Sequence, residues 1–441
     1  MPYKHKSSAD IDYFYFFELL RLIMMNISNI FTITLLAGAL SACGGDSKTT
    51  STSSTTLEPT TPTAPTKPTT PTAPQVNALG ISAIPDTLKK TYTPTLKFDR
   101  FAKIKTPNGG AINILAQDEV TDNQIVRARN ILQHYLTNYP GSMYGTDKSA
   151  VANKIADSGA VLLLLNGVDD GTNAAAQLDG QPLYYGEMQV EGGNWYINQN
   201  YEHRDASYEE ILHFVHDYGI GVDQNASFNG VLPAYQAEIR AAQISALSGK
   251  LWAWPAEQAS WITELTAENS LSQEYLASVI DTYYGLWGAF DSQYGMWGMY
   301  IAKNRADLAT KDPEGAAIMD NKFFHPYLTY NARIDSRFVG DFSLKFSSSL
   351  AYTNHSQYLK DVTLTGTNES NVVVNQLNNN ITGNSAVNTT IFSGSSSEYQ
   401  ITFENGQVTV QDLQDNRDGL NVLTSIEKLK FSDTTMDAPS A

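Results

Sequence analysis

Apolar positions in the middle of the chain follow two periods, one typical of helices and one typical of strands. Apolar residues recur at helical spacing through Thr121–Leu136, and Thr121 can cap that helix. Ala160–Leu165 is a continuous apolar run and predicts a buried strand. Trp195–Ile197 follows a Gly-Gly turn and predicts another strand. Further helices are expected over residues 149–157, 234–247, 256–267 and 272–284.

The order of these elements and a change of composition divide the globular part of the chain into two domains. Helical and strand patterns are interleaved over residues 78–350, which predicts an α+β domain. Residues 362–433 are instead rich in Thr, Asn, Ser and Val. Short alternating runs predict a small all-β module there, with strands at residues 372–374, 389–392, 399–403 and 408–410.

The N-terminal region contains the only cysteine in the sequence, Cys43. It follows the apolar run Ile30–Leu40, which is shorter than the roughly 20 residues that cross a bilayer but fits the core of a signal peptide. Leu40-Ser-Ala-Cys43 resembles the lipobox of bacterial lipoprotein signal peptides. The resemblance implies that residues 1–43 form the signal and that acylated Cys43 anchors the chain in a membrane. Gly44 and Gly45, in place of an Asp, imply the outer membrane.

Residues 44–77 are dominated by Ser, Thr, Pro and Ala, and their prolines are regularly spaced. Prolines fall at 59, 62, 65, 68, 71 and 74, which is every third residue. A polyproline II helix has three residues per turn, so these prolines would line one edge of a stiff, hydrated segment. We expect a spacer that holds the folded part away from the membrane.

The net charge of the chain limits the kinds of molecule that it is expected to bind. The formal net charge is −17 and the sequence pI is near 4.8, which disfavours contact with nucleic acid because the phosphate backbone is also anionic. Nucleic-acid binding is therefore not expected. A single cysteine leaves no disulfide, so stability must come from burial or from bound ions.

Residues 205–219 carry the densest set of ionisable side chains in the chain. Asp205 or Ser207 can cap a helix there, and Gly219 can end it. One stripe of this helix is apolar, and a second carries Glu209, His213 and His216 at positions i, i+4 and i+7, with Glu210 and Asp217 beside them.

The segment Glu209-Glu210-Ile-Leu-His213 resembles the His-Glu-x-x-His signature of zincin metallopeptidases, with Glu209 in place of the first histidine. The resemblance implies a Zn²⁺ site in which Glu209 and His213 are ligands and Glu210 is the general base that activates water. In zincins of the gluzincin type a Glu on a later helix completes the site. Glu274 is the preferred third ligand here, and the alternates are Glu238, His216 and Asp217.

A purely structural interpretation of the same helix remains open. Ser207-x-x-Glu210 fits a capping box, and Glu209 with His213 fits an ordinary surface pair. Four further side chains are candidate neighbours of the site. His203 and Arg204 could neutralise an anionic intermediate, and His325 and Tyr330 could reach the site from the end of the domain.

The C-terminal module carries a second resemblance. The pattern from Phe392-Ser-Gly394 through Asn416-Arg-Asp-Gly419 to Phe431-Ser-Asp433 resembles the β-rich cap that follows hemolysin-type (RTX) calcium repeats. In that family, Gly- and Asp-rich nonapeptides wind into a parallel β-roll that binds Ca²⁺. The preceding stretch keeps Gly366-Thr-Asn368 and Gly383-Asn384 but lacks the glycine pairs and aspartates. The candidate Ca²⁺ ligands are Asp412, Asp415 and Asp418, which also fit a turn around Gly419.

Two functions are consistent with these observations. The first is a membrane-tethered, zincin-like, metal-dependent hydrolase with a peptide as its substrate class. The second is a non-catalytic surface lipoprotein that binds a glycan or a protein partner. Tyr283–Tyr300 together with Trp252, Trp254 and Trp261 supplies aromatic rings that could line a groove for such a ligand or pack a core.

Overall fold

The computed structural model describes residues 76–440 except 200, 202–203 and 223–228. Cys43, the signal segment, nearly all of the proline-rich spacer and His203 therefore lie outside the described residues. The described residues belong to a single structural unit. Within the part of the chain that is described, no helix combines the length and the apolar character needed to cross a bilayer.

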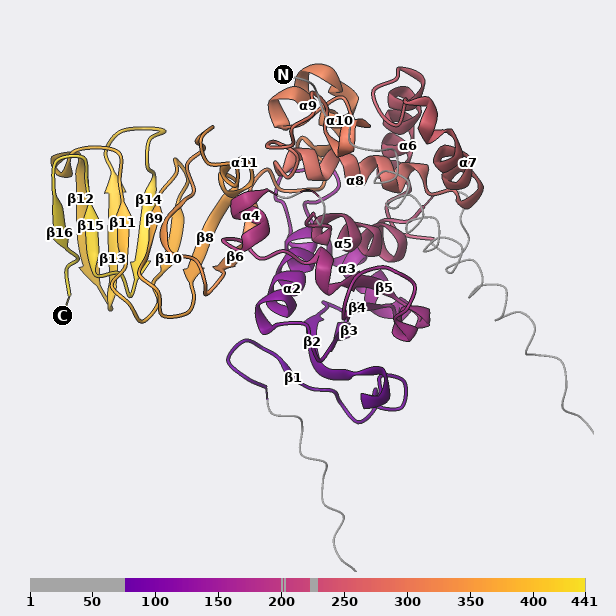
Figure 1. Cartoon of the computed structure of the whole chain (residues 1–441), viewed down its shortest axis with the longest axis horizontal. Coiled ribbons are helices and arrows are strands. Elements are labelled where there is room, and N and C mark those ends of the chain that lie inside the picture. The colour runs from indigo at the N-terminus through magenta and orange to yellow at the C-terminus, as the bar shows by residue number, and fades with distance from the viewer. Residues whose placement is uncertain (1–75, 200, 202–203, 223–228, 441) are drawn as a thin grey trace, which may run out of the picture. The chain divides into compact units, whose positions relative to one another are not determined.

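A five-stranded mixed sheet forms the first layer of the α+β part (Figure 1). Its strand order is β1-β2-β3-β4-β5, with β1 to β3 antiparallel and β3 to β5 parallel. The strands are β1 (Ser82–Ala83), β2 (Phe98–Lys105), β3 (Ala111–Gln117), β4 (Val161–Leu165) and β5 (Gln181–Tyr184). Strand β4 is fully buried, as its apolar run predicts, because both faces of the sheet are covered. Val161, Leu163 and Leu165 pack into the cluster on one face, while α2, α3 and α5 contact strands of the sheet.

Most of the predicted helices are present close to their expected limits. The helices are α2 (Asp122–Leu136), α3 (Ser149–Ser158), α4 (Asn194–Asn198), α5 (Ser207–Val215), α6 (Pro233–Ser248), α7 (Ala259–Glu268), α8 (Leu271–Tyr283), α9 (Arg305–Lys311) and α10 (Pro313–Met319), of which α4, α9 and α10 were not predicted. Thr121 caps α2 through a capping box with Gln124. The helix predicted from residue 256 begins with a 3₁₀ turn, Ala256–Gln258, and becomes α-helical at Ala259.

The strand predicted at Trp195–Ile197 is wrong, because these residues lie in α4. The helix is short and ends where Gln199 adopts a left-handed conformation with φ 50°. Trp195 and Tyr196 are nevertheless buried, and Tyr196 donates a hydrogen bond to Asp205. Aromatic residues that favour strands are held here in a helix by tertiary packing. Of the five strands in the sheet, β5 is the one that packs against α5.

The C-terminal part is a two-sheet roll (Figure 1). From β6 to β11 the chain passes alternately from one sheet to the other, whereas β12 to β14 follow one another in the first sheet and β15 and β16 in the second. One sheet has the order β12-β13-β14-β10-β8-β6 and the other β16-β15-β11-β9-β7. Successive coils pair in parallel, as β6 with β8 and β7 with β9 show. The elements are β6 (Leu328–Ile334), β7 (Gly340–Ser343), α11 (Thr353–Ser356), β8 (Leu359–Leu364), β9 (Ser370–Val373), β10 (Asn379–Thr382), β11 (Thr389–Ile391), β12 (Tyr399–Glu404), β13 (Gln407–Asp412), β14 (Leu420–Thr424), β15 (Lys428–Lys430) and β16 (Thr435–Asp437).

Asparagine side chains join successive coils of this roll. The amides of Asn379 and Asn388 donate to the carbonyls of Lys360 and Ser370, at 2.9 Å and 2.8 Å. Asn375 and Asn384 make the same kind of contact with Leu359 and Asn368. Coils also approach closely at Gly383, where a Cβ atom would lie 1.8 Å from the carbonyl oxygen of Ser425.

The roll begins earlier in the sequence than its composition suggests. Strands β6 and β7 pair with β8 and β9, so the C-terminal sheets extend across the boundary expected between residues 350 and 362. The aromatic rings of residues 283–300 mainly pack a core, since Trp287 is 1 % exposed and Trp252 is fully buried.

Candidate metal centre

Helix α5 is buried on its polar side as well as on its apolar side. Tyr208, Ile211 and Leu212 are fully buried, and Glu209 and His213 are only 7 % and 8 % exposed. The interpretation of Glu209 and His213 as a surface pair is therefore wrong. The capping-box interpretation is also wrong, because the N-cap is Ala206 and Ser207 lies inside the helix. Burial of ionisable side chains requires counter-charges or a bound cation.

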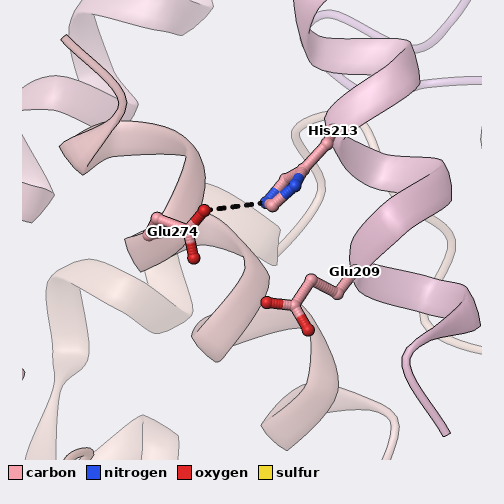
Figure 2. Close-up of side chains that lie close together, drawn as sticks. All are labelled: Glu209, His213 and Glu274. Atoms are coloured by element: carbon pink, nitrogen blue, oxygen red, sulfur yellow. Dashed lines mark ion pairs between the residues drawn. The ribbon is translucent and has the colours of Figure 1, made fainter. Parts of the chain in front are cut away.

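Two helices bring three of the predicted ligands together. Glu209 and His213 on α5 face Glu274 on α8, and each offers one ligand atom within 4.8 Å of the others. The Nε2 atom of His213 lies 3.6 Å from Oε1 of Glu274. Figure 2 shows the three side chains pointing toward one another from the two helices. One imidazole and two carboxylates form a donor set that suits Zn²⁺ and leaves room for a fourth ligand.

Glu210 lies beside this cluster. Its Oε2 atom is 4.0 Å from Nδ1 of His213 and accepts a 2.7 Å hydrogen bond from Nε2 of Gln181. Gln181 is the first residue of β5, and both of these side chains are buried. The strand thus fixes the orientation of the carboxylate assigned as the general base.

Arg204 supplies a positive charge at the same place. Its guanidinium pairs with Glu209 and lies 3.1 Å from Oδ2 of Asp281, which is on α8. The guanidinium also lies 4.9 Å from the ring centroid of Trp297 and 5.6 Å from that of Trp287. Burial raises the pKa of Asp281 to about 7, and the charge of Arg204 opposes that rise. Arg204 therefore forms ion pairs with both helices that carry the candidate ligands.

The alternate ligands lie apart from the cluster of Glu209, His213 and Glu274. His216 begins a π turn, His216–Ile220, and its Nε2 contacts Gln236. Asp217 in the same turn accepts a hydrogen bond from Gln273, and burial holds its pKa well above the usual range. Helix α5 thus continues beyond the expected stop at Gly219 by one residue in π geometry.

Glu238 on α6 is engaged elsewhere. It accepts a 2.7 Å hydrogen bond from Tyr144 and pairs with Lys322 at 2.8 Å. Arg240, two residues later in the same helix, donates to Asn269. Glu238 is therefore a suitable control for experiments on Glu274.

The candidate calcium ligands are used in internal contacts or lie at the surface. Asp412 is paired with Arg417, with Nη2 of the arginine 2.6 Å from Oδ1. Asp418 is fully buried and accepts hydrogen bonds from Tyr399 and from the backbone of Ser393, each at 2.6 Å. Asp415 is exposed. Among the described residues, these three aspartates do not form a cluster with metal-ligand spacing.

Two residues of the site were not found by sequence reasoning. Asp281 lies seven residues after Glu274, a spacing that places both on one face of the predicted helix, so the pattern could have revealed it. Gln181 carried a weaker signal, as a polar residue at the start of a short apolar segment. No known protein family and no curated protein matches this chain in sequence.

Proposed function

We propose that this chain is a zinc-dependent hydrolase, with peptides as its substrate class, in which Glu209, His213 and Glu274 hold the ion. The convergence of these three buried or half-buried side chains from two helices is the observation that carries the proposal. The two carboxylates match the charge of a divalent cation, and imidazole and carboxylate are both common ligands of catalytic zinc. When bound, the ion supplies Lewis acidity to a water molecule and to the substrate carbonyl.

The protein side chains divide the remaining tasks. Glu210 accepts the proton of the attacking water and delivers it to the leaving group, the role of a general base and then a general acid. The hydrogen bond from Gln181 orients its carboxylate for this transfer. Arg204 compensates the negative charge of Glu209 and Asp281, so that the site does not hold uncompensated anions when substrate enters.

Zinc content and hydrolysis test the proposal directly. We expect the purified full-length protein to bind one Zn²⁺ per chain, measured by atomic emission, and to cleave fluorescent casein. His213→Ala and Glu274→Gln should lose both properties. Glu238→Gln should retain both, because Glu238 lies outside the cluster. Glu210→Gln should bind zinc but lose cleavage. Absence of zinc at stoichiometric amounts, or binding that survives His213→Ala, would end the proposal.

The binding-protein alternative makes the opposite prediction for Glu210. A non-catalytic surface protein would show no activity that depends on Glu210, and its ligand binding would depend on aromatic side chains. The burial of Trp252 and Trp287 disfavours them as an open ligand platform. We therefore retain the hydrolase as the better-supported function.

We further propose that acylated Cys43 tethers the enzyme to the outer membrane. The support is the lipobox resemblance of Leu40–Cys43 and the proline-rich spacer behind it. Metabolic labelling with a palmitate analogue should mark the wild-type chain and not Cys43→Ala. Labelling that is equal in both would contradict the tether without bearing on the zinc site.

A further inference from the structure

The first coil of the roll contacts both helices that carry the candidate metal ligands. His355 in α11 donates from Nδ1 to the carbonyl of Tyr284, directly after the end of α8, at 2.8 Å. Its other ring nitrogen, Nε2, faces the hydroxyl of Tyr208 on α5 at 3.4 Å. Tyr208 immediately precedes Glu209 in the sequence. His355 therefore contacts α5 next to the candidate ligand Glu209. It also contacts the C-terminal end of α8, the helix that carries Glu274.

Strand β6 makes a second connection to α5. The hydroxyl of Tyr330 on β6 lies 2.5 Å from that of Tyr208 and donates at 2.6 Å to Oε1 of Glu191. Because Tyr330 donates to a carboxylate, Tyr208 is the donor in the contact between the two hydroxyls. Tyr208, Tyr330 and Glu191 are all buried, which excludes competing water from these bonds.

The connection continues to the first turn of α5 through a buried arginine. Nε of Arg127 donates to Glu191 at 3.1 Å, and Nη2 donates to Asp205 at 2.6 Å. Asp205 in turn accepts from the backbone of Ser207, the first residue of α5. The N-terminal turn of the helix is thus fixed by a continuous set of charge-assisted hydrogen bonds that begins in the roll.

We propose that the first coil of the roll, defined as β6 and α11, is the positioning element of the metal centre, and that His355 sets the spacing of α5 and α8. This inference rests on the proposed function. The ligands come from two helices, so their mutual distance follows the distance between those helices, and metal sites tolerate displacements of only about 0.5 Å. His355 is a positioning residue, since it acts through Tyr208 and Tyr284.

Zinc affinity of full-length variants tests this role. We expect His355→Ala to weaken zinc binding at least tenfold, the range found for residues that orient metal ligands. His355→Asn should recover most of the affinity, because its amide can donate to the carbonyl of Tyr284 as Nδ1 does. Tyr330→Phe should weaken binding in the same direction but less. This substitution removes only one hydroxyl group. It therefore still tests the inference if His355→Ala does not fold.

Asn388→Ala is the matched control. Asn388 is fully buried in the roll and donates to Ser370, and its hydrogen bonds to Asn384 and Glu427 also lie within the roll. The control should lower the melting temperature and leave zinc affinity within twofold of wild type. Affinity within twofold for both His355→Ala and Tyr330→Phe, or an equal loss in Asn388→Ala, would overturn the inference.

A readout that needs no metal separates this inference from the proposed function. In metal-free protein, backbone amides of α5 should exchange hydrogen faster in His355→Ala than in wild type, and at the wild-type rate in Asn388→Ala. Unchanged exchange in α5 of His355→Ala would overturn the positioning role even if zinc binds. A wild-type chain that binds no zinc would overturn the proposed function and, with it, a role for His355 at a metal centre.

Discussion

Gln181 and Glu210, which are 29 positions apart in sequence, are joined by a 2.7 Å hydrogen bond between buried side chains. The amide belongs to the first residue of β5 and the carboxylate to the first turn of α5. A carboxylate that must receive a proton works best when its orientation is fixed before substrate arrives. The strand thus has a direct role in the chemistry proposed for the helix.

Replacing Gln181 by Leu should separate orientation from metal binding. The variant keeps the proposed zinc ligands Glu209, His213 and Glu274 but removes the donor to Glu210. We expect casein cleavage to fall about tenfold, equivalent to roughly 1.4 kcal/mol in the activation free energy, while zinc stoichiometry stays at the wild-type value. A loss of zinc together with activity would show that β5 holds the helix itself and not only the carboxylate.

Arg204→Met should make stability depend more strongly on zinc. The guanidinium compensates Glu209 and Asp281, and removing one partner of a buried ion pair costs roughly 3 kcal/mol or more. We expect that loss in urea unfolding with chelator present. Added zinc should restore more stability to the variant than it adds to wild type, because the cation replaces the missing charge beside Glu209.

Arg129→Met provides the comparison, since the guanidinium of Arg129 donates to the carbonyl of Leu79, near the start of the described residues. The free energy of unfolding of this variant should differ from that of wild type by the same amount with and without zinc. If Arg204→Met shows the same stability in chelator and in zinc, the guanidinium and the ion do not share Glu209.

Glu191 should make the free energy of unfolding fall as the pH is lowered. Burial alone would raise its pKa, but the charge of Arg127 and the contacts of His355 and Tyr330 more than offset that effect and lower it to about 2. Below the ordinary value of 4.5 the unfolded chain takes up a proton that the folded chain does not, so stability is lost as the pH falls from 4.5 toward 2. The full contribution is about 3 kcal/mol.

Urea unfolding of Glu191→Gln at pH 5, 4 and 3 measures this contribution. The variant should be less stable at pH 5, because Arg127 loses a counter-charge. Its stability should then fall less steeply with acid than that of wild type, by about 2 kcal/mol between pH 5 and 3, because the rest of the contribution is lost only below pH 3. Parallel pH profiles for the two proteins would show that Glu191 titrates normally.

Lys148 gives the opposite kind of pH dependence. Burial lowers the pKa of its ammonium group from 10.5 to about 7, and Nζ donates to the carbonyl of Tyr135 at 2.9 Å. Between pH 7 and 10.5 the unfolded chain holds a proton that the folded chain releases, so the free energy of unfolding rises with pH in that window. The gap between the two pKa values corresponds to roughly 5 kcal/mol.

Lys148→Met should therefore stabilise the protein at pH 7. Leaving the carbonyl of Tyr135 without this donor costs about 1–3 kcal/mol, so we expect a net gain of roughly 2 kcal/mol or more. Chemical unfolding at pH 7, 8.5 and 10 should show a gain that shrinks as the pH rises. A variant less stable than wild type at pH 7 would mean that the ammonium group is favourable where it lies.

Local patterns predicted the helices that carry the site but not the contacts that complete it. The helical periodicity of α5 and α8 depends only on residues a few positions apart in the sequence. The zincin-like spacing of Glu209 and His213 likewise lies within the nine residues of α5. The pairing of Arg204 with Asp281 spans 77 positions, and no local period encodes it. The α+β class was confirmed, whereas the zincin resemblance stays a prediction.

The start of the roll was missed for a related reason. Its first strands contain buried aromatic residues, Tyr330 on β6 and Phe342 on β7, as the helical part does. The change to Thr, Asn and Ser appears only from residue 362, after these strands. Composition therefore located the later coils, and the coil that contacts α5 was assigned to the preceding domain.

The asparagine contacts between coils predict that the roll folds without calcium. Asn375, Asn379, Asn384 and Asn388 donate to carbonyls of neighbouring coils, which leaves those oxygens engaged. Asp412 and Asp418 are neutralised or hydrogen-bonded by Arg417 and Tyr399. Each buried amide hydrogen bond of this kind contributes roughly 1 kcal/mol to the free energy of unfolding. Removing the amide leaves the carbonyl buried without a donor, which costs the full desolvation free energy of that carbonyl.

Thermal unfolding in EDTA and in millimolar Ca²⁺ tests this expectation. The melting temperature should be the same in both for wild type and for Asp415→Ala, whose side chain is exposed. Asn388→Asp should lower stability by about 2 kcal/mol or more, because it replaces a buried donor with a carboxylate opposite the carbonyl of Ser370. A calcium-dependent rise in melting temperature that disappears in Asp415→Ala would instead assign Asp412, Asp415 and Asp418 to a cation site, and the amides to a secondary role.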